Sequence, residues 1–133
     1  DLKFHKETII GRYVYIGRGF DSASPLIIGD LVLISTECKI IGNDHDYTKV
    51  GSPTRLEFNY KNDTTVIEAD VWIGKRVTIK QGIRIGTGSV IGSESLVLKD
   101  VPPYTVMGGS PAKIIKARFN SDQIISHEAK IFP

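Results

Sequence analysis

The sequence has only one cysteine among its 133 residues, Cys38, and only one methionine and one tryptophan. A single cysteine cannot form a disulfide within the chain, and disulfides are a feature of oxidising compartments. We therefore expect a cytoplasmic protein whose fold depends on the burial of apolar side chains. The chain begins at Asp1 and its one methionine is Met107, so we also expect that a natural N-terminal segment is missing.

Long hydrophobic runs and an excess of one charge are also absent. No apolar stretch approaches the roughly 18 residues that a membrane-spanning helix needs, so we expect no membrane span. The chain has 17 Lys and Arg against 15 Asp and Glu, and its net charge of +2 is too small to indicate a nucleic-acid-binding surface. The length and composition predict a single globular domain, residues 1–133, with one continuous core.

What the sequence does contain is a six-residue repeat. From Ile67 to Pro102 it divides into the hexads IEADVW, IGKRVT, IKQGIR, IGTGSV, IGSESL and VLKDVP. The first position of each hexad is aliphatic, and the fifth is small or β-branched. A period of six fits neither the 3.6 residues of a helix nor the alternation of a strand. Hexapeptide repeats are instead typical of a parallel β-helix.

The same period runs through an earlier block. Its first positions are Ile10, Ile16, Ser22, Ile28, Ile34 and Ile40. The second position is often glycine in both blocks: Gly11, Gly17, Gly29, Gly74, Gly86 and Gly92. We interpret these glycines as corner residues, because glycine adopts positive φ without steric cost.

These patterns predict an all-β fold in which each hexad forms one short strand and one corner. Three hexads, about 18 residues, then close one triangular coil. First- and fifth-position side chains point inward, and each isoleucine buried in this way contributes on the order of 1.5–3 kcal/mol. A single coil cannot hide its apolar face, so the stability comes from the stacking of neighbouring coils.

The two blocks are out of register, which predicts a loop between them. We expect coils over about 10–45 and 66–102, a loop over 46–65 and a C-terminal tail over 103–133. Loops on rigid scaffolds often carry function. In the tail, Asn120 or Ser121 can cap a short helix that ends at Ile131. The residues expected to point inward from this helix are Ile124, Ile125 and Ala129.

His45 stands at the start of this loop, between Asp44 and Asp46. A histidine can accept a proton from a hydroxyl or amine near neutral pH, and a neighbouring carboxylate can fix its tautomer. It can also be an ordinary surface residue, but its place beside the repeat favours the catalytic interpretation. We interpret His5 and His127 as surface residues. No three ligands converge in the sequence, so we expect no metal site, and a zinc β-helix is disfavoured.

Three further features have both a structural and a functional interpretation. Cys38 occupies an inward fifth position, which predicts a buried thiol rather than a nucleophile. Trp72 occupies an outward sixth position, which favours contact with a ligand or another subunit over simple surface packing. Lys113 and Lys116 lie close together with Arg118, as either a solvated face or a clamp for phosphates.

Three segments resemble the hexapeptide-repeat acyltransferases, which have a left-handed parallel β-helix. The segments are DHDY, VIEADVWIGKRVTI and VLKDVPPYTVMGGSPAKIIKARF, within a resemblance that extends from about Ile10 to Phe119. The sequence is similar to maltose and galactoside, polysaccharide and lipopolysaccharide, and xenobiotic O-acetyltransferases. The resemblance implies a homotrimer that binds acetyl-coenzyme A between subunits and needs no metal.

The resemblance also assigns roles to individual positions. His45 stands where the family has its catalytic base. The positions that match coenzyme contacts are Trp72, Lys75, Ser93, Leu98, Lys99, Lys113 and Lys116. The sugar-acetylating relatives hold their acceptor with an asparagine and an aspartate, and Tyr15 and Ala23 stand at those positions here. The acceptor-binding residues are therefore not carried over.

The resemblance and the lone histidine together predict an acetyl-CoA-dependent O-acetyltransferase with direct transfer. His45 removes the proton from an acceptor hydroxyl, and backbone N–H groups at a coil corner hold the oxyanion. The first candidate acceptor is a sugar hydroxyl of a polysaccharide or lipopolysaccharide unit. An antibiotic or an amino-sugar nitrogen is the alternative within the same chemistry. A non-catalytic trimeric β-helix scaffold is the alternative from another class.

Overall fold

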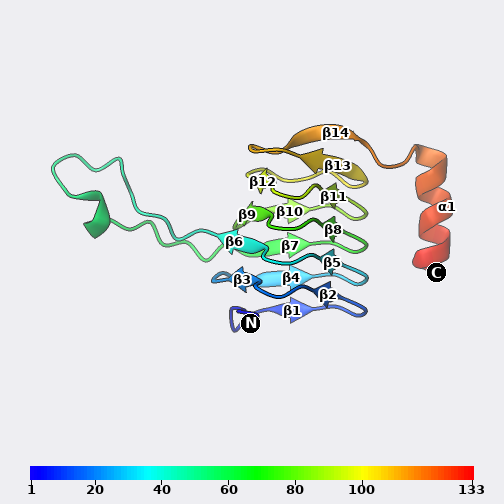
Figure 1. Ribbon diagram of the computed structural model, residues 1–133, viewed down its shortest axis with the longest axis horizontal. Coiled ribbons are helices and arrows are strands. Elements are labelled where there is room, and N and C mark those ends of the chain that lie inside the picture. The colour runs from blue at the N-terminus through cyan, green and yellow to red at the C-terminus, as the bar shows by residue number, and fades with distance from the viewer.

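A computed structural model describes all 133 residues as a stack of short strands, with an arm on one side and a helix on the other (Figure 1). The strands of the stack are β1 (Ile9–Ile10), β2 (Tyr15–Ile16), β3 (Asp21–Ser22), β4 (Leu26–Ile28), β5 (Leu33–Ile34), β6 (Lys39–Ile41), β7 (Thr65–Ile67), β8 (Trp72–Ile73), β9 (Thr78–Lys80), β10 (Arg84–Ile85), β11 (Val90–Ile91) and β12 (Leu96–Val97). They are followed by β13 (Thr105–Gly108), β14 (Lys113–Ala117) and helix α1 (Ser121–Ile131). The expected β fold and short C-terminal helix are confirmed.

Successive strands pass in turn to three sheets. The first sheet has the order β1-β4-β7-β10, the second β14-β13-β11-β8-β5-β2 and the third β12-β9-β6-β3. Every pair is parallel except β13 with β14. Partners within a block are 18 residues apart, as in Ile10 with Ile28 and Ile73 with Ile91. One coil is therefore three hexads long, as the repeat predicts.

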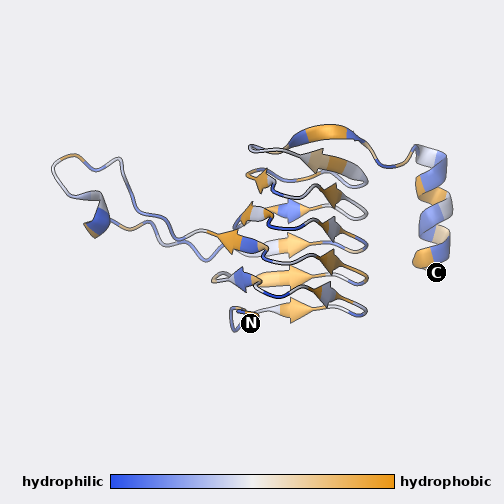
Figure 2. Cartoon of the chain, in the orientation of Figure 1, coloured by the Kyte–Doolittle hydropathy of each residue, from blue (hydrophilic) through white to orange (hydrophobic).

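The core is a column of inward side chains from the first and fifth hexad positions. All six first positions of the second block are buried: Ile67, Ile73, Ile79, Ile85, Ile91 and Val97. Cys38 is buried at a fifth position, and Ser89 and Ser95 are buried polar members of the same set. The column is less well covered at its N-terminal end, where Ile10 remains exposed. The outward residues of the first sheet are also apolar at β1, β4 and β7 (Figure 2).

The reason why the second position of the hexad is glycine differs from the one that the sequence suggests. None of these glycines has positive φ. A Cβ at Gly29 would lie 2.8 Å from the backbone nitrogen of Ala69 in the next coil, and one at Gly74 would lie 2.6 Å from that of Ser93. These glycines are therefore required by the close approach of stacked backbones. The left-handed residue is instead the fourth of the hexad: Tyr13, Gly19, Leu31, Glu37, Asn43, Asp70, Arg76, Gly82, Gly88 and Glu94.

Residues 42–64 leave the stack between β6 and β7 as an arm. Across it, Ile28 of β4 pairs directly with Ile67 of β7, so the coils continue as if the arm were absent. The arm is an antiparallel ribbon with a 3-10 turn at Thr54–Leu56, and it projects far from the coils (Figure 1). No arm residue belongs to the core cluster. Its base is tied to the stack by Gln81 Nε2, which donates to the Lys61 carbonyl at 2.7 Å.

Helix α1 is attached to the opposite side of the stack by polar contacts. Asn120 caps it in a capping box with Gln123, as expected. The expectation that Ile125 and Ala129 point inward is wrong, because both are exposed and only Ile124 is half-buried. The helix carries too few residues, and too many polar ones, to cross a membrane.

Asp70, at the corner between β7 and β8, is the point of attachment for this helix. Its carboxylate accepts hydrogen bonds from His127 Nε2 at 2.8 Å and from Arg118 at 3.1 Å. The buried Tyr104 donates its hydroxyl proton to Glu128 at 2.8 Å. His127 is therefore half-buried and paired, which corrects its interpretation as an ordinary surface residue.

The stacking constraint on glycine makes a testable prediction. Gly29→Ala should lower the free energy of unfolding by about 1–3 kcal/mol or more, because the new methyl group meets backbone that cannot move aside. The matched control is Gly92→Ala, also at a second position, where a Cβ meets nothing nearer than 3.5 Å. Denaturant unfolding of the two variants measures the difference, and equal stabilities would contradict the proposed cause.

The attachment of α1 should depend on pH. Burial, followed by the hydrogen bond to Glu128, raises the pKa of Tyr104 to about 12. Because the unfolded value is about 10, the stabilising effect of the neutral phenol is fully present below pH 10 and is lost as pH rises toward 12. The stability difference between wild type and Tyr104→Phe should therefore shrink, by on the order of 1–2 kcal/mol, between pH 9 and pH 12. A difference independent of pH in denaturant unfolding would contradict this.

Candidate active site

His45 lies on the arm, where the ribbon holds its ring in place. It forms an antiparallel bridge with Phe58. The residues next to them are also hydrogen-bonded across the ribbon, since Asn59 donates its N–H to the Asp44 carbonyl at 2.8 Å. The Nδ1 atom of His45 lies 3.0 Å from the carbonyl oxygens of both Thr54 and Glu57. Both partners of this nitrogen are thus acceptors.

This arrangement determines the tautomer of the neutral imidazole. A carbonyl oxygen can only accept, so Nδ1 must carry the proton that both oxygens share. The other ring nitrogen, Nε2, is then unprotonated and can accept a proton from a substrate. His45 is exposed, and Nε2 makes no hydrogen bond within the chain. The arm therefore presents the basic nitrogen of His45 to its surroundings.

The carboxylates beside His45 do not have the role that the sequence suggests. Asp46 accepts hydrogen bonds from the hydroxyl of Thr48 at 2.6 Å and from its N–H at 2.9 Å. The Thr48 hydroxyl, followed by its N–H, holds the pKa of Asp46 below its ordinary value. Asp46 therefore shapes the start of the arm, and the tautomer of His45 is set by backbone carbonyls.

An aromatic ladder continues from the His45 ring along the arm. The centroids of His45 and Phe58 are 4.6 Å apart, and Tyr60 stacks on Phe58 at 5.2 Å with an interplanar angle of 6°. The repeat does not predict these partners, which lie outside its frame, although the alternation of Phe58 and Tyr60 is typical of a strand. Five large apolar or aromatic side chains of the arm are exposed: Tyr47, Val50, Leu56, Phe58 and Tyr60.

Two of the expected coenzyme contacts lie one above the other at the corner between the second and third sheets. Lys75 follows β8, and Ser93 follows β11 in the next coil. The Lys75 N–H donates to the Ser93 hydroxyl at 3.0 Å. Both side chains are exposed, so this corner offers an ammonium group and a hydroxyl to solvent.

Three more of the expected contacts meet near the C-terminal end of the stack. Leu98, Lys99 and Lys113 line a depression of about 290 Å³ together with Pro111 and Ala112. The Ala112 N–H donates to the Leu96 carbonyl at 2.8 Å, so the segment before β14 stacks on the last coil. Two lysines on a partly apolar floor suit an anionic ligand with an apolar portion. Lys116 is exposed further along β14 and does not line this depression.

Trp72 lies on the outer face of the second sheet, as its outward position predicts. It pairs with Leu33 of β5 and Val90 of β11. The same three residues line a groove of about 470 Å³ that ends at the Asp70–Arg118 ion pair. The indole is 51% exposed, which leaves a large apolar surface without a partner in the chain.

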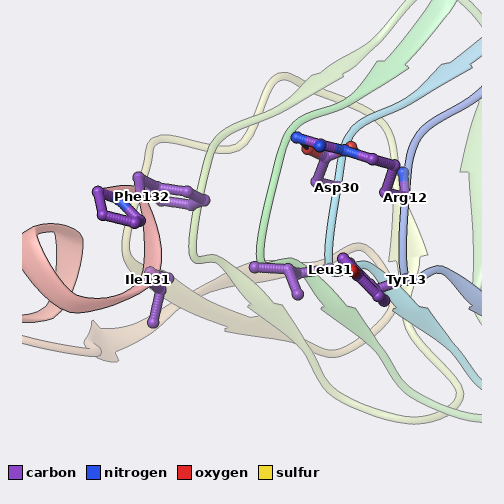
Figure 3. A pocket seen from close by; sticks show the side chains of 7 residues that line it. Arg12, Tyr13, Asp30, Leu31, Ile131 and Phe132 are labelled. Atoms are coloured by element: carbon purple, nitrogen blue, oxygen red, sulfur yellow. Dashed lines mark hydrogen bonds and ion pairs between the residues drawn. The ribbon is translucent and has the colours of Figure 1, made fainter.

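The candidate residues therefore fall into separate groups. The hydrogen bonds and ring contact of His45 are all made within the arm. The other expected residues lie on the coils and on β14. A further cavity, of about 440 Å³, lies between the corner that holds Arg12 and Asp30 and the end of α1 (Figure 3). It includes none of the candidate residues.

No covalent nucleophile accompanies His45. Burial raises the pKa of the Cys38 thiol, and the thiol donates to the Gly74 carbonyl at 3.0 Å. A buried thiol with a raised pKa is a poor nucleophile. The chain also has no group of three or more His, Cys, Asp or Glu side chains placed to hold a metal ion. The residues around His45 fit proton transfer.

Comparisons with known proteins agree with the repeat. The family of bacterial transferases with hexapeptide repeats matches residues 64–99. A probable macrolide acetyltransferase of Lysinibacillus sphaericus is 36% identical and covers 92% of this chain, which spans 72% of that protein. The chain therefore belongs to the hexapeptide-repeat acetyltransferases, as its resemblance to them predicts.

Two further similarities are informative. A chloramphenicol acetyltransferase of Escherichia coli is 42% identical in an alignment that covers 78% of this chain and 57% of that protein. A solved hexapeptide-repeat acetyltransferase of Vibrio cholerae, in complex with acetyl-coenzyme A, has 35% identity and a TM-score of 0.77. The match covers 86% of this chain and 62% of that one. The chain thus spans little more than half the length of the Escherichia coli relative.

Proposed function

We propose that this protein is an acetyl-CoA-dependent O-acetyltransferase in which His45 is the general base. The observation that carries the proposal is the fixed tautomer of His45, whose Nδ1 donates to two carbonyls while Nε2 remains free. The family to which the chain belongs supports acetyl transfer, and the complex of the Vibrio cholerae relative supports acetyl-coenzyme A as the donor.

The reaction is a direct transfer. His45 Nε2 takes the proton of the acceptor hydroxyl as the hydroxyl oxygen attacks the carbonyl carbon of the thioester. The tetrahedral intermediate then collapses with cleavage of the carbon–sulfur bond, and the imidazolium returns its proton to the departing thiolate. A positioned base of this kind contributes about 10²–10⁴-fold to the rate. No acyl-enzyme is needed, in agreement with the burial of Cys38.

The donor is proposed to follow the corner that holds Lys75 and Ser93 and to reach the depression lined by Leu98, Lys99 and Lys113. The phosphates of coenzyme A are anionic, and the exposed ammonium groups of Lys99 and Lys113, with Lys116 beyond them, can attract these phosphates. Trp72 is proposed to line the same region from the second sheet. These roles fit the chemistry of the side chains.

The active form is proposed to be a homotrimer of left-handed β-helices with its sites between subunits. Exposed apolar surfaces and the position of His45 support shared sites. The arm exposes aromatic and apolar side chains around His45, and the second sheet exposes Trp72 and Leu33. Large apolar surfaces of this kind are usually covered by a partner. His45 also makes no contact with the proposed donor-binding residues of its own chain.

Two classes of acceptor fit the proposed reaction. The sequence suggests a sugar hydroxyl, whereas the relatives from Escherichia coli and Lysinibacillus sphaericus are named for antibiotics. The ladder of Phe58 and Tyr60 beside His45 is aromatic and exposed, which suits an acceptor with an apolar portion. We therefore place an antibiotic-like hydroxyl first and a saccharide hydroxyl second, with the cytoplasm as the expected location.

The proposal predicts the behaviour of His45→Ala. Thiol release from acetyl-coenzyme A is measured across a panel of hydroxylated antibiotics, sugars and amino sugars. On the acceptor that supports turnover, kcat should fall by about 10²-fold or more, because the base is lost. The Kd for acetyl-coenzyme A should not change, since the proposed contacts to its phosphates are made by lysines and not by His45.

The control variant for this experiment is His5→Ala, which removes a histidine that lies outside the arm, in the segment before β1. Turnover by His45→Ala at the wild-type rate would contradict the assignment of the base. A correctly folded wild-type protein that neither binds acetyl-coenzyme A nor turns over any acceptor would favour the non-catalytic scaffold.

The lysines generate a separate prediction. Lys99→Ala and Lys113→Ala should each raise the KM for acetyl-coenzyme A roughly tenfold, because each removes a charged contact to phosphate. The kcat should change little, and the effect should weaken at high salt because the ammonium groups are exposed. Lys130→Ala, on the far helix, is the control. Steady-state kinetics in which all three variants behave alike would contradict the proposed donor site.

A further inference from the structure

We infer that Ser52 and Glu57 are positioning residues for His45, joined by a side-chain hydrogen bond that holds the base in its active tautomer. The inference rests on the proposed function, in which Nε2 of His45 accepts the proton. The two carbonyl acceptors lie on an arm that contributes no residue to the core, so core packing does not hold them in place.

Both acceptors of the His45 proton belong to one tight turn. The turn is the 3-10 segment Thr54–Leu56, with Pro53 as its N-cap and Glu57 as its C-cap. Its backbone is closed by the Leu56 N–H, which donates to the Pro53 carbonyl at 2.9 Å, and by the Glu57 N–H, which donates to the Thr54 carbonyl at 3.1 Å. A single turn closed by two hydrogen bonds and exposed to water is weakly held. Its geometry therefore needs a further constraint.

The Ser52–Glu57 hydrogen bond supplies that constraint. The Ser52 hydroxyl donates to Glu57 Oε1 at 2.7 Å, and this bond spans the whole turn. Ser52 and Glu57 are half-buried, whereas most of the arm is exposed. A short hydrogen bond between half-buried groups is stronger than an exposed one, because water competes less for its donor and acceptor.

Glu57 connects this bond directly to the base. Its carbonyl accepts from His45 Nδ1 at 3.0 Å and from the Asp46 N–H at 3.2 Å. One residue thus joins the turn, the facing strand and the imidazole. When the side-chain bond is removed, the carbonyls of Thr54 and Glu57 are free to move away from Nδ1. The proton can then occupy Nε2, and in that tautomer Nε2 cannot take the proton of the acceptor hydroxyl.

The test uses two disrupting variants and two that conserve the bond. Ser52→Ala removes the donor and Glu57→Ala removes the acceptor. Ser52→Thr retains a hydroxyl, and Glu57→Gln retains an oxygen that can accept. Thr64→Ala, which removes an exposed hydroxyl near the base of the arm, is the matched control. The core contains no arm residue, so all five variants should unfold at the wild-type midpoint.

The first readout is the tautomer of His45, from long-range ¹H–¹⁵N correlation spectra of the imidazole, assigned by comparison with His45→Ala. Wild type, Ser52→Thr, Glu57→Gln and Thr64→Ala should show Nδ1 protonated. Ser52→Ala and Glu57→Ala should show a mixture of tautomers. The second readout is kinetic: kcat should fall by about tenfold or more in the two disrupting variants, with KM for acetyl-coenzyme A unchanged.

The outcomes separate this inference from the proposed function. Wild-type imidazole spectra in both Ser52→Ala and Glu57→Ala would overturn the inference. A shifted tautomer in these variants, together with full activity of His45→Ala, would support the pair as the determinant of the tautomer and overturn the role of His45 as base. Loss of activity that neither conservative variant restores would also overturn the inference.

Discussion

The structure depends on the stacking of inward side chains at an 18-residue period. Each isoleucine of the first hexad position lies on another one coil away, as Ile73 does on Ile91. Strands of two or three residues would not be stable alone, so each coil is held by its neighbours. This stacking brings the backbones of successive coils close together at Gly29 and Gly74. It also fixes the corners and outer faces of the coils, on which Trp72, Lys75, Ser93, Leu98 and Lys99 are placed.

The repeat predicted most of the fold because burial of the first and fifth positions determines it. The hexad frame identified the inward residues, the coil length and the interruption between Ile40 and Ile67. It did not identify why the second position is glycine, because the cause is an approach between residues 18 or more positions apart. The inward side of α1 was also predicted incorrectly, since the helix is attached through Asp70, His127 and Tyr104 rather than through an apolar face.

The candidate site was predictable in its residue types but not in its geometry. His45 is predicted to be the base from its position beside the repeat. Its partners were expected to be the adjacent aspartates, whereas the structure places Nδ1 against the carbonyls of Thr54 and Glu57. Backbone carbonyls have no sequence signature, so only the fold of the arm reveals them. The separation of His45 from Lys99 and Lys113 likewise follows from where the arm leaves the stack, and it supports the proposal that a complete site takes residues from two copies of the chain.

Complementation between two variants that are each impaired at low acetyl-coenzyme A tests this proposal of shared sites most directly. His45→Ala and the double variant Lys99→Ala/Lys113→Ala would be co-expressed with different affinity tags, and oligomers that carry both tags would be assayed for acetyl transfer at low acetyl-coenzyme A. If His45 from one subunit and the lysines from another form one site, some sites in the mixed oligomer are fully wild type. The account predicts that a substantial fraction of wild-type activity returns. Mixed oligomers as inactive as either parent would contradict the account and place the complete site within a single chain.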